Sequence, residues 1–181
     1  MTRDETPVVH VKQMDVEVDY HQAYLMDEGR SVGGFDFDNV PSPPVGIIRV
    51  EKGSALLTVG PQWATVKFTV AVADRDPGAD LDGYEDIVEI SYESPSGRLS
   101  LEEWGGGRAH TLPPLPAGPG TYRLRYHARG MDEEDSLDAI AEHYFLQIWP
   151  EPPCDPAVLK STSSLFQYWL NSERSRQAGA E

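Results

Sequence analysis

The segment from Gly118 to Pro150 constrains the fold of this chain more than any other stretch. In its first half, apolar residues at positions 122, 124, 126 and 128 alternate with basic residues at positions 123, 125, 127 and 129. This period of two places one set of side chains inward, on the core face of a β-strand, and the other set toward solvent. Residues 142–149 are denser in apolar and aromatic side chains, as expected of a strand deep in a sheet. The segment therefore predicts two long strands, joined by an acidic connector, around which other strands assemble.

Most of the remaining chain has the pattern of short strands separated by turns. Sixteen glycines and fifteen prolines among 181 residues favour turns over long helices. Further strands are predicted at residues 14–26, 45–50, 55–59, 64–73, 84–93, 99–104 and 108–112. Because strands do not alternate with long helices, the sequence predicts an all-β fold, an antiparallel β-sandwich of eight or nine strands with a short C-terminal helix. A β-barrel is the alternative.

Three segments are expected along the chain. Residues 1–13 are polar and predicted to be loose, residues 14–150 form the β-sandwich domain, and residues 151–181 form a proline-rich linker with a C-terminal helix and tail. Ser164 and Gln167 fit a capping box at the start of that helix. Apolar residues mark one side of it, namely Leu165, Phe166, Trp169 and Leu170. Whether this side packs on its own domain or on a partner stays open.

The charge of the chain limits its partners. The formal net charge is −15, with a pI near 4.6, so nucleic acid and anionic membranes are repelled and a basic protein is the natural complement. An acidic surface that only keeps the protein soluble is the simpler explanation. The chain has one cysteine, no apolar signal-peptide core and no apolar stretch long enough to span a membrane. A cytoplasmic location is therefore expected, while the oligomeric state is left open.

The basic row of the predicted hairpin has two interpretations. It is a candidate anion-binding strip formed by Arg123, Arg125, His127 and Arg129. Alternatively, it is a structural ladder of ion pairs with carboxylates spaced two residues apart on a neighbouring strand. Those carboxylates are Glu89 and Glu93, or Asp15, Glu17 and Asp19.

Motifs of catalysis and metal binding are missing from the sequence. It contains no nucleophile elbow, no zinc-protease helix and no P-loop, and its five histidines are scattered. The acidic loop at residues 74–83 has oxygen ligands suited to calcium, but their spacing is not that of an EF-hand. Cys154 lies among prolines, with no nearby helix or basic residue to activate it, and is therefore interpreted as an ordinary thiol. The sequence thus favours a binding protein over an enzyme, with no cofactor and no metal site.

The motif Asp19-Tyr20-His21-Gln22 resembles the first strand of the ComJ-like family, the inhibitors of competence-associated DNA-entry nucleases. A mid-chain strand at residues 64–72 and the Gly120-Thr121-Tyr122 strand are similar to later parts of that family, and the resemblance spans residues 14–149. It implies a non-enzymatic β-protein that binds and blocks a basic nuclease or another toxin-like enzyme, as an inhibitor or immunity protein. The longer acidic loop and the tail after Pro150 depart from the family pattern.

Acidic side chains on two loops could imitate the phosphates that a nuclease grips, since electrostatic steering favours such contacts. The partner-binding residues predicted in this way are Asp74, Asp76, Asp80, Asp82, Asp132, Glu133, Glu134 and Asp135. A carbohydrate or small-ligand binding module is the alternative, with aromatic candidates Trp63, Trp104, Trp149 and Trp169. An enzyme whose site is assembled from loops is a third interpretation.

Overall fold

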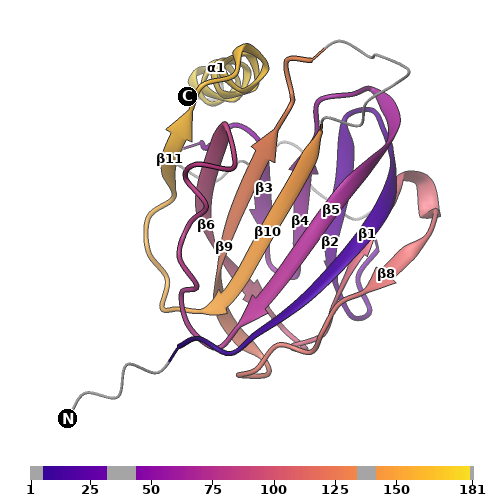
Figure 1. The fold of residues 1–181 in the computed structure, drawn as a ribbon, viewed down its shortest axis with the longest axis vertical. Coiled ribbons are helices and arrows are strands. Elements are labelled where there is room, and N and C mark those ends of the chain that lie inside the picture. The colour runs from indigo at the N-terminus through magenta and orange to yellow at the C-terminus, as the bar shows by residue number, and fades with distance from the viewer. Residues whose placement is uncertain (1–5, 32–43, 134–141, 180–181) are drawn as a thin grey trace.

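The computed structural model describes residues 6–31, 44–133 and 142–179 (Figure 1). This part of the chain is mostly β, with one C-terminal α-helix, as the sequence predicts. The elements are β1 (Val9–Asp19), β2 (Gln22–Asp27), β3 (Ile48–Glu51), β4 (Ser54–Thr58), β5 (Trp63–Ala73), β6 (Asp86–Ser94), β7 (Leu99–Glu102), the 3-10 turn η2 (Trp104–Gly106), β8 (Ala109–Thr111), β9 (Gly120–Arg129), β10 (His143–Pro150), β11 (Ala157–Ser161) and α1 (Ser164–Ala178).

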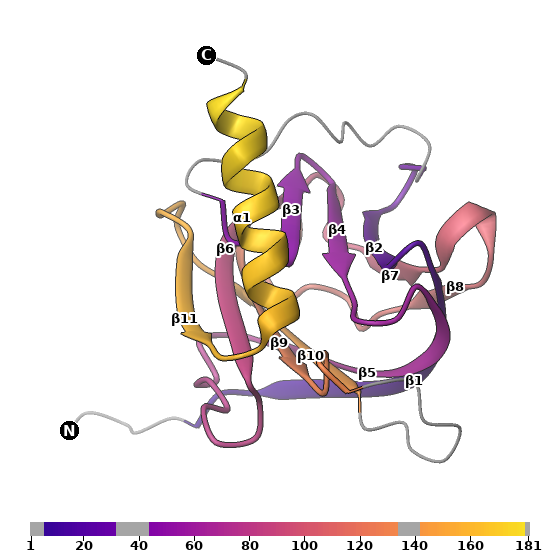
Figure 2. The ribbon, with the colours of Figure 1, turned by 90° about the horizontal axis from the view of Figure 1, so that it is seen from above.

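All described strands belong to one sheet that curls into an open half-barrel (Figures 1 and 2). Its order is β11-β6-β9-β10-β5-β1-β2-β4-β3, with β7 paired to β2 and β8 paired to β7. The sheet is mixed, because β10 runs parallel to β5 while the other pairs are antiparallel. The predicted antiparallel sandwich is therefore corrected to a single, curled, mixed sheet.

The parallel pair has a direct structural consequence. The antiparallel hairpin of β9 and β10 is inserted between β5 and β6, so β5 and β6 run in the same direction. Parallel strands cannot be joined by a tight turn. The connection at residues 74–85 must return along the length of the sheet, from the end of β5 to the start of β6, and it passes over the outer face of β9 and β10.

The concave face of the sheet holds the core. The apolar row predicted for β9 is buried there, together with the inward side chains of β5 and β10. Its members include Tyr122, Leu124, Tyr126, Ala128, Val66, Phe68, Val70, Val72, Tyr144, Leu146 and Ile148. This confirms the inward side assigned from the period of two, whereas three of the four basic residues predicted to face solvent, Arg123, Arg125 and His127, are buried.

The strands extend beyond the limits expected from the sequence. β1 begins at Val9, so residues 9–13 pair with β5 instead of being loose. After the prolines that follow β10, β11 adds to the far edge of the sheet by pairing with β6. The proline-rich stretch thus interrupts the sheet without ending it.

Helix α1 stands between the two ends of the curled sheet, with β6 and β11 on one side and β3 on the other (Figure 2). Its cap is Ser163, whose hydroxyl accepts from the backbone N–H of Phe166, one residue before the cap predicted at Ser164. Phe166 and Leu170 are buried in the core cluster, and each stabilises this docking by about 2 kcal/mol. Gly46 lets the helix approach closely, because a Cβ there would press on both side chains. The helix packs on its own domain.

A buried ion pair ties α1 to β3. Glu173 accepts a hydrogen bond from Arg49 Nε at 2.9 Å and one from the N–H of Gly46 at 3.0 Å. Burial raises the pKa of Glu173, although Arg49 and the Gly46 N–H act in the opposite direction.

Among the residues described, no helix is long and apolar enough to cross a lipid bilayer.

Candidate functional site

The basic row of β9 does not form an open strip. Arg123 and Arg125 are each 4% exposed and His127 is fully buried, whereas Arg129 is exposed. The row faces the outer side of the sheet, as the alternation predicts, but the connection at residues 74–85 and the stretch after β10 cover it. The side chains in it are therefore engaged within the protein.

Arg125 is the centre of this covered network. Its guanidinium donates to Asp76 at 2.8 and 3.1 Å, to Glu89 at 3.2 Å and to Gln147 at 2.8 Å, and it lies 4.5 Å from the centre of the Trp149 ring. Burial opposes the charged form, but the hydrogen bonds to Asp76 and the charge of Glu89 outweigh it and raise the pKa of Arg125. Five donors in a fixed fork suit such a multiple contact.

Arg123 takes part in the same network. It donates to Glu89 at 3.3 Å and to the backbone carbonyls of Cys154 and Asp155 at 3.2 and 2.9 Å. Glu89 thus bridges both arginines, as the ion-pair interpretation of the row expects for this residue. These contacts fasten the stretch after β10 onto the sheet.

The His127 side chain binds the backbone of the connection at residues 74–85. Its Nε2 accepts from the N–H of Asp80 at 3.2 Å, so its Nδ1 carries the proton that it donates to the Phe145 carbonyl at 3.1 Å. Burial lowers the pKa of His127 to about 4. The ring is therefore neutral at pH 7, and its hydrogen bond to Asp80 holds the connection at residues 74–85 against β9.

The acidic residues of the first predicted partner-binding loop are divided between internal contacts and solvent. Asp74 accepts from the N–H of Val8 at 3.0 Å and pairs with Arg75, which lowers the pKa of Asp74. Asp76 pairs with Arg125, and Asp80 accepts from the N–H of Gly83 at 2.9 Å. Asp82 is exposed. The described part of the chain contains no group of three or more His, Cys, Asp or Glu residues arranged to hold a metal ion.

The second predicted acidic loop is also divided. The Asp132 carboxylate accepts from the N–H groups of Ser164 and Leu165 at 2.7 and 2.9 Å, and so it caps the N-terminus of α1. Glu133 is exposed and lines a pocket. Glu134 and Asp135 lie outside the described residues.

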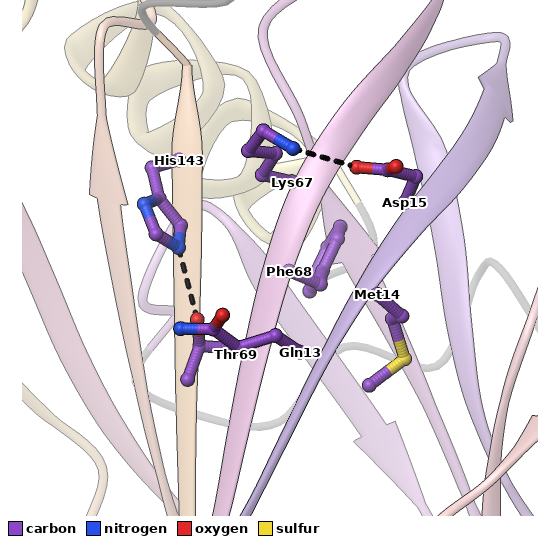
Figure 3. Close-up of a pocket in the computed structure, with 7 residues that line it drawn as sticks. All are labelled: Gln13, Met14, Asp15, Lys67, Phe68, Thr69 and His143. Carbon is purple, nitrogen blue, oxygen red and sulfur yellow. Dashed lines mark hydrogen bonds and ion pairs between the residues drawn. The ribbon is translucent and has the colours of Figure 1, made fainter.

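A small pocket on the outer face lies between β1, β5 and β10 (Figure 3). Lys67 pairs with Asp15 at 3.0 Å, and His143 Nε2 bonds the Thr69 hydroxyl at 3.0 Å. Arg129 donates to His143 Nδ1 at 3.2 Å, so Nε2 carries the ring proton. Burial lowers the pKa of His143, and the charges of Arg129 and Lys67 act in the same direction. The polar groups of this pocket largely satisfy one another.

A strained turn at the end of β1 forms a different kind of surface. The sequence pattern predicted one strand over residues 14–26, but Tyr20 and His21 have φ values of 52° and 63° and turn the chain between β1 and β2. Positive φ is costly for bulky side chains, and two-residue turns of this kind normally contain Asn and Gly. Such strain is held by surrounding contacts and is often found at functional sites. His21 supplies one such contact, because its Nδ1 bonds the Gly60 carbonyl at 2.9 Å.

Three exposed aromatic residues lie on the segments that meet at this turn. Tyr20 is 54% exposed, and its ring lies 4.9 Å from that of Trp104, which is 43% exposed. Trp63 begins β5 and lies opposite Asp19 in the backbone pairing of β1 with β5, next to the turn. Its side chain is 79% exposed. We call Tyr20, Trp63 and Trp104 the aromatic turn.

Glu103 fixes the segment that carries Trp104 against β1. Its carboxylate accepts from the N–H of Glu17 at 3.1 Å, the N–H of Arg108 at 3.1 Å and His110 Nε2 at 3.2 Å. Burial by itself raises the pKa of Glu103, but the three donors outweigh it and the pKa lies below its usual range. The exposed indole of Trp104 thus follows directly after a residue that is hydrogen-bonded to β1 and to the segment that leads into β8.

Comparisons with known proteins place the fold beside one solved structure. A protein described as crocagin biosynthetic gene J matches with a TM-score of 0.53 and 14% sequence identity, over 80% of this chain and 99% of that protein. At this identity the match shows a similar fold and nothing further. No family model matches the chain, and no curated protein matches it by sequence.

The sequence identified the residues of the aromatic turn but not the turn itself. Tyr20 lies in the motif of the family resemblance, and Trp63 and Trp104 are among the aromatic candidates for ligand binding. The pair Tyr20-His21 contains none of the usual turn residues Gly, Asn and Asp, and the moderate preference of histidine for left-handed backbone is too weak to predict a turn. Only the long-range pairing of β1 with β5 and of β2 with β4 and β7 forces the reversal.

Proposed function

We propose that this protein is an acidic, non-enzymatic binding protein that docks a basic protein through its aromatic turn. The observation that carries the proposal is the exposure of Tyr20, Trp63 and Trp104 around one strained turn, where Glu103 ties the segment before Trp104 to β1. Large exposed aromatic groups are costly to leave in water, and Trp and Tyr dominate the binding energy of protein interfaces. The net charge of −15 favours a cationic partner.

An inhibitor or immunity protein of a basic nuclease or toxin is the form of this function that we favour. The motif Asp19-Tyr20-His21-Gln22, which belongs to the resemblance to ComJ-like inhibitors, spans the end of β1, the strained turn that carries Tyr20 and the start of β2. Acidic residues on the adjacent strand, Glu17 and Asp19, would face the basic groove of such an enzyme. The name of the structural neighbour, crocagin biosynthetic gene J, refers to biosynthesis and to no binding partner.

This proposal places the interface at the aromatic turn instead of at the two acidic loops that carry Asp76 and Asp132. Asp76 is occupied by Arg125 and Asp132 by the N-terminus of α1, so recruiting either to a partner would break an internal contact. Asp82 and Glu133 remain exposed and can contribute to steering.

Capture from the native host, followed by nuclease and toxin assays on the captured protein, tests the proposal. We expect a basic protein whose activity falls when this protein binds, with association that slows steeply as salt is added, because exposed charges are screened. Association that is insensitive to salt, or binding without any loss of activity, would contradict the inhibitor function.

A carbohydrate-binding module is the second candidate, and the same exposed indoles favour it. The rings of Tyr20 and Trp104 are inclined by 47°, so these two do not form the flat platform on which a sugar ring stacks. Titration of oligosaccharides against tryptophan fluorescence separates the two functions. Saturable quenching that Trp63→Ser abolishes would favour the carbohydrate module.

A further inference from the structure

Beside the aromatic turn lies a pocket with a cavity volume of about 400 Å³. It is lined by His21, Gly60, Pro61, Gln62, Met131, Glu133 and Glu142. His21 and Gln62 directly follow Tyr20 and precede Trp63 in the chain, so the pocket and the aromatic turn are parts of one surface. Among the described residues that line the pocket there is no Lys or Arg, whereas two are glutamates.

The backbone around Gly60 and the side chain of Tyr144 build this pocket. The N–H of Gly60 donates to the buried Tyr144 hydroxyl at 2.7 Å, and that hydroxyl in turn bonds the Glu142 carboxylate. A Cβ at position 60 would collide with the Glu142 carboxylate, so glycine is required for the carboxylate to lie where it does. The orientation of Glu142 is therefore set by groups that are themselves fixed.

The remaining polar side chains have matching chemistry. His21 Nδ1 faces the Gly60 carbonyl at 2.9 Å, and a carbonyl can only accept, so Nδ1 carries a proton. The ring is held from its other side by Trp169, whose ring centre is 5.6 Å away. The other polar side chains include the carboxylates of Glu133 and Glu142, which are acceptors and suit a group with several N–H donors and a positive charge.

We propose that this pocket receives one cationic side chain, an arginine or a lysine, of the partner protein that docks on the aromatic turn. The inference rests on the proposed binding function and identifies the contact that selects the partner. A guanidinium fits best, because its planar fork can bond two acceptors at once. The aromatic turn then supplies apolar contact area, and the pocket supplies the charge that rejects neutral or acidic surfaces.

Binding of N-acetyl-L-arginine amide, followed by NMR chemical shifts of the whole protein, tests the pocket without the partner. N-acetyl-L-citrulline amide, which is nearly the same shape but neutral, is the matched ligand control. We expect the arginine probe to shift the amides of His21, Gly60 and Gln62, and citrulline to bind at least about ten-fold more weakly. Equal binding of the two probes, shifts confined to other regions, or no shifts with either probe would overturn the proposal.

Variants distinguish the pocket from a general effect of charge. Glu142→Gln and Glu133→Gln each should weaken the arginine probe by about ten-fold. Glu93→Gln removes the same charge from an exposed position on β6 outside the pocket, and it should leave binding unchanged. An equal loss in Glu93→Gln and Glu133→Gln would refute the pocket. Because Glu133 is exposed, its variant keeps the test valid even if Glu142→Gln disturbs folding.

The same variants separate this inference from the proposed function. If the captured partner depends on Trp63 but binds the Glu142→Gln and Glu133→Gln variants normally, the pocket proposal fails while the binding function stands. If the arginine probe binds as expected but Trp63→Ser leaves every captured protein in place, docking on the aromatic turn fails. Displacement of the probe by calcium, with tight calcium binding, would identify a metal site and overturn the proposal.

Discussion

Lowering the pH from 7 to 5 is expected to destabilise the protein by about 2 kcal/mol through His127 alone. The ring is buried, its Nε2 is occupied by the N–H of Asp80, and its pKa is about 4 in the folded protein. In the unfolded chain the pKa is about 6.5. The folded-state pKa lies below the unfolded one, so the stability is fully present above pH 6.5 and is lost as the pH falls toward 4.

The magnitude follows from the protons bound at each pH. At pH 5 the unfolded chain is almost fully protonated at this position, whereas the folded protein is about one-tenth protonated, and linkage converts that difference to about 2 kcal/mol. At pH 7 the same difference is only about 0.2 kcal/mol. His143 has a pKa lowered in the same direction, so the wild-type protein should lose somewhat more than His127 alone accounts for.

Urea unfolding followed by tryptophan fluorescence at pH 7 and pH 5 measures this effect. His127→Gln removes the titrating group and should lower stability at pH 7, since two hydrogen bonds of the ring are lost or weakened, while reducing the dependence on pH by about 2 kcal/mol. An unchanged m-value would show that the two pH values compare the same transition. If the variant and the wild-type protein have equal pH dependence, then His127 does not titrate as the buried, loop-bound ring that the structure describes.

Three further substitutions test how the covered network and α1 are held. Arg125→Leu should cost about 3 kcal/mol in chemical denaturation, because it leaves Glu89 without a main partner; unchanged stability would mean that the arginine row is not structural. Glu173→Ala should cost a similar amount, because Arg49 stays buried without its carboxylate, and a change within about 0.5 kcal/mol would contradict the ion pair. Asp132→Ala should cost about 1 kcal/mol through the lost cap of α1, and unaltered stability would show that Asp132 is free for a partner.

Local periodicity predicted which side of each long strand faces the core. The apolar row of β9 and the row of β5 are buried as the alternation indicates, because burial of one face determines the register of a strand. The apolar side of α1 was equally clear from Phe166 and Leu170. The sequence is thus sufficient to identify the core-facing side of a single strand or helix.

The arrangement of the strands depends on contacts that no local pattern contains. Nothing near Trp63–Ala73 or His143–Pro150 indicates that these two strands are parallel neighbours. That pairing forces residues 74–85 across the outer face, and it is why the basic row of β9 is covered. The solvent-facing pattern of a strand cannot distinguish water from a polar loop that packs over it.

The candidate site shows the same division. Exposed tryptophans and an acidic chain could be proposed from composition, but their gathering at Tyr20 depends on the reversal of the chain at two residues with unsuitable propensity. The pocket depends on Gly60, Tyr144 and Glu142, which are brought together by β4, β5 and β10. The aromatic turn and the pocket are therefore created by the long-range pairing of strands, which no local sequence motif encodes.

Docking of a basic protein on the aromatic turn is tested most directly by quantitative capture from the native host with three forms of the protein. Trp63→Ser removes the most exposed residue of the aromatic turn, whereas Leu159→Ser removes an exposed apolar side chain from β11, at the far edge of the sheet. We predict that the wild-type protein and Leu159→Ser retain the same basic protein at low salt, that Trp63→Ser loses it by at least about ten-fold, and that salt elutes it. Equal retention by all three forms would contradict the account.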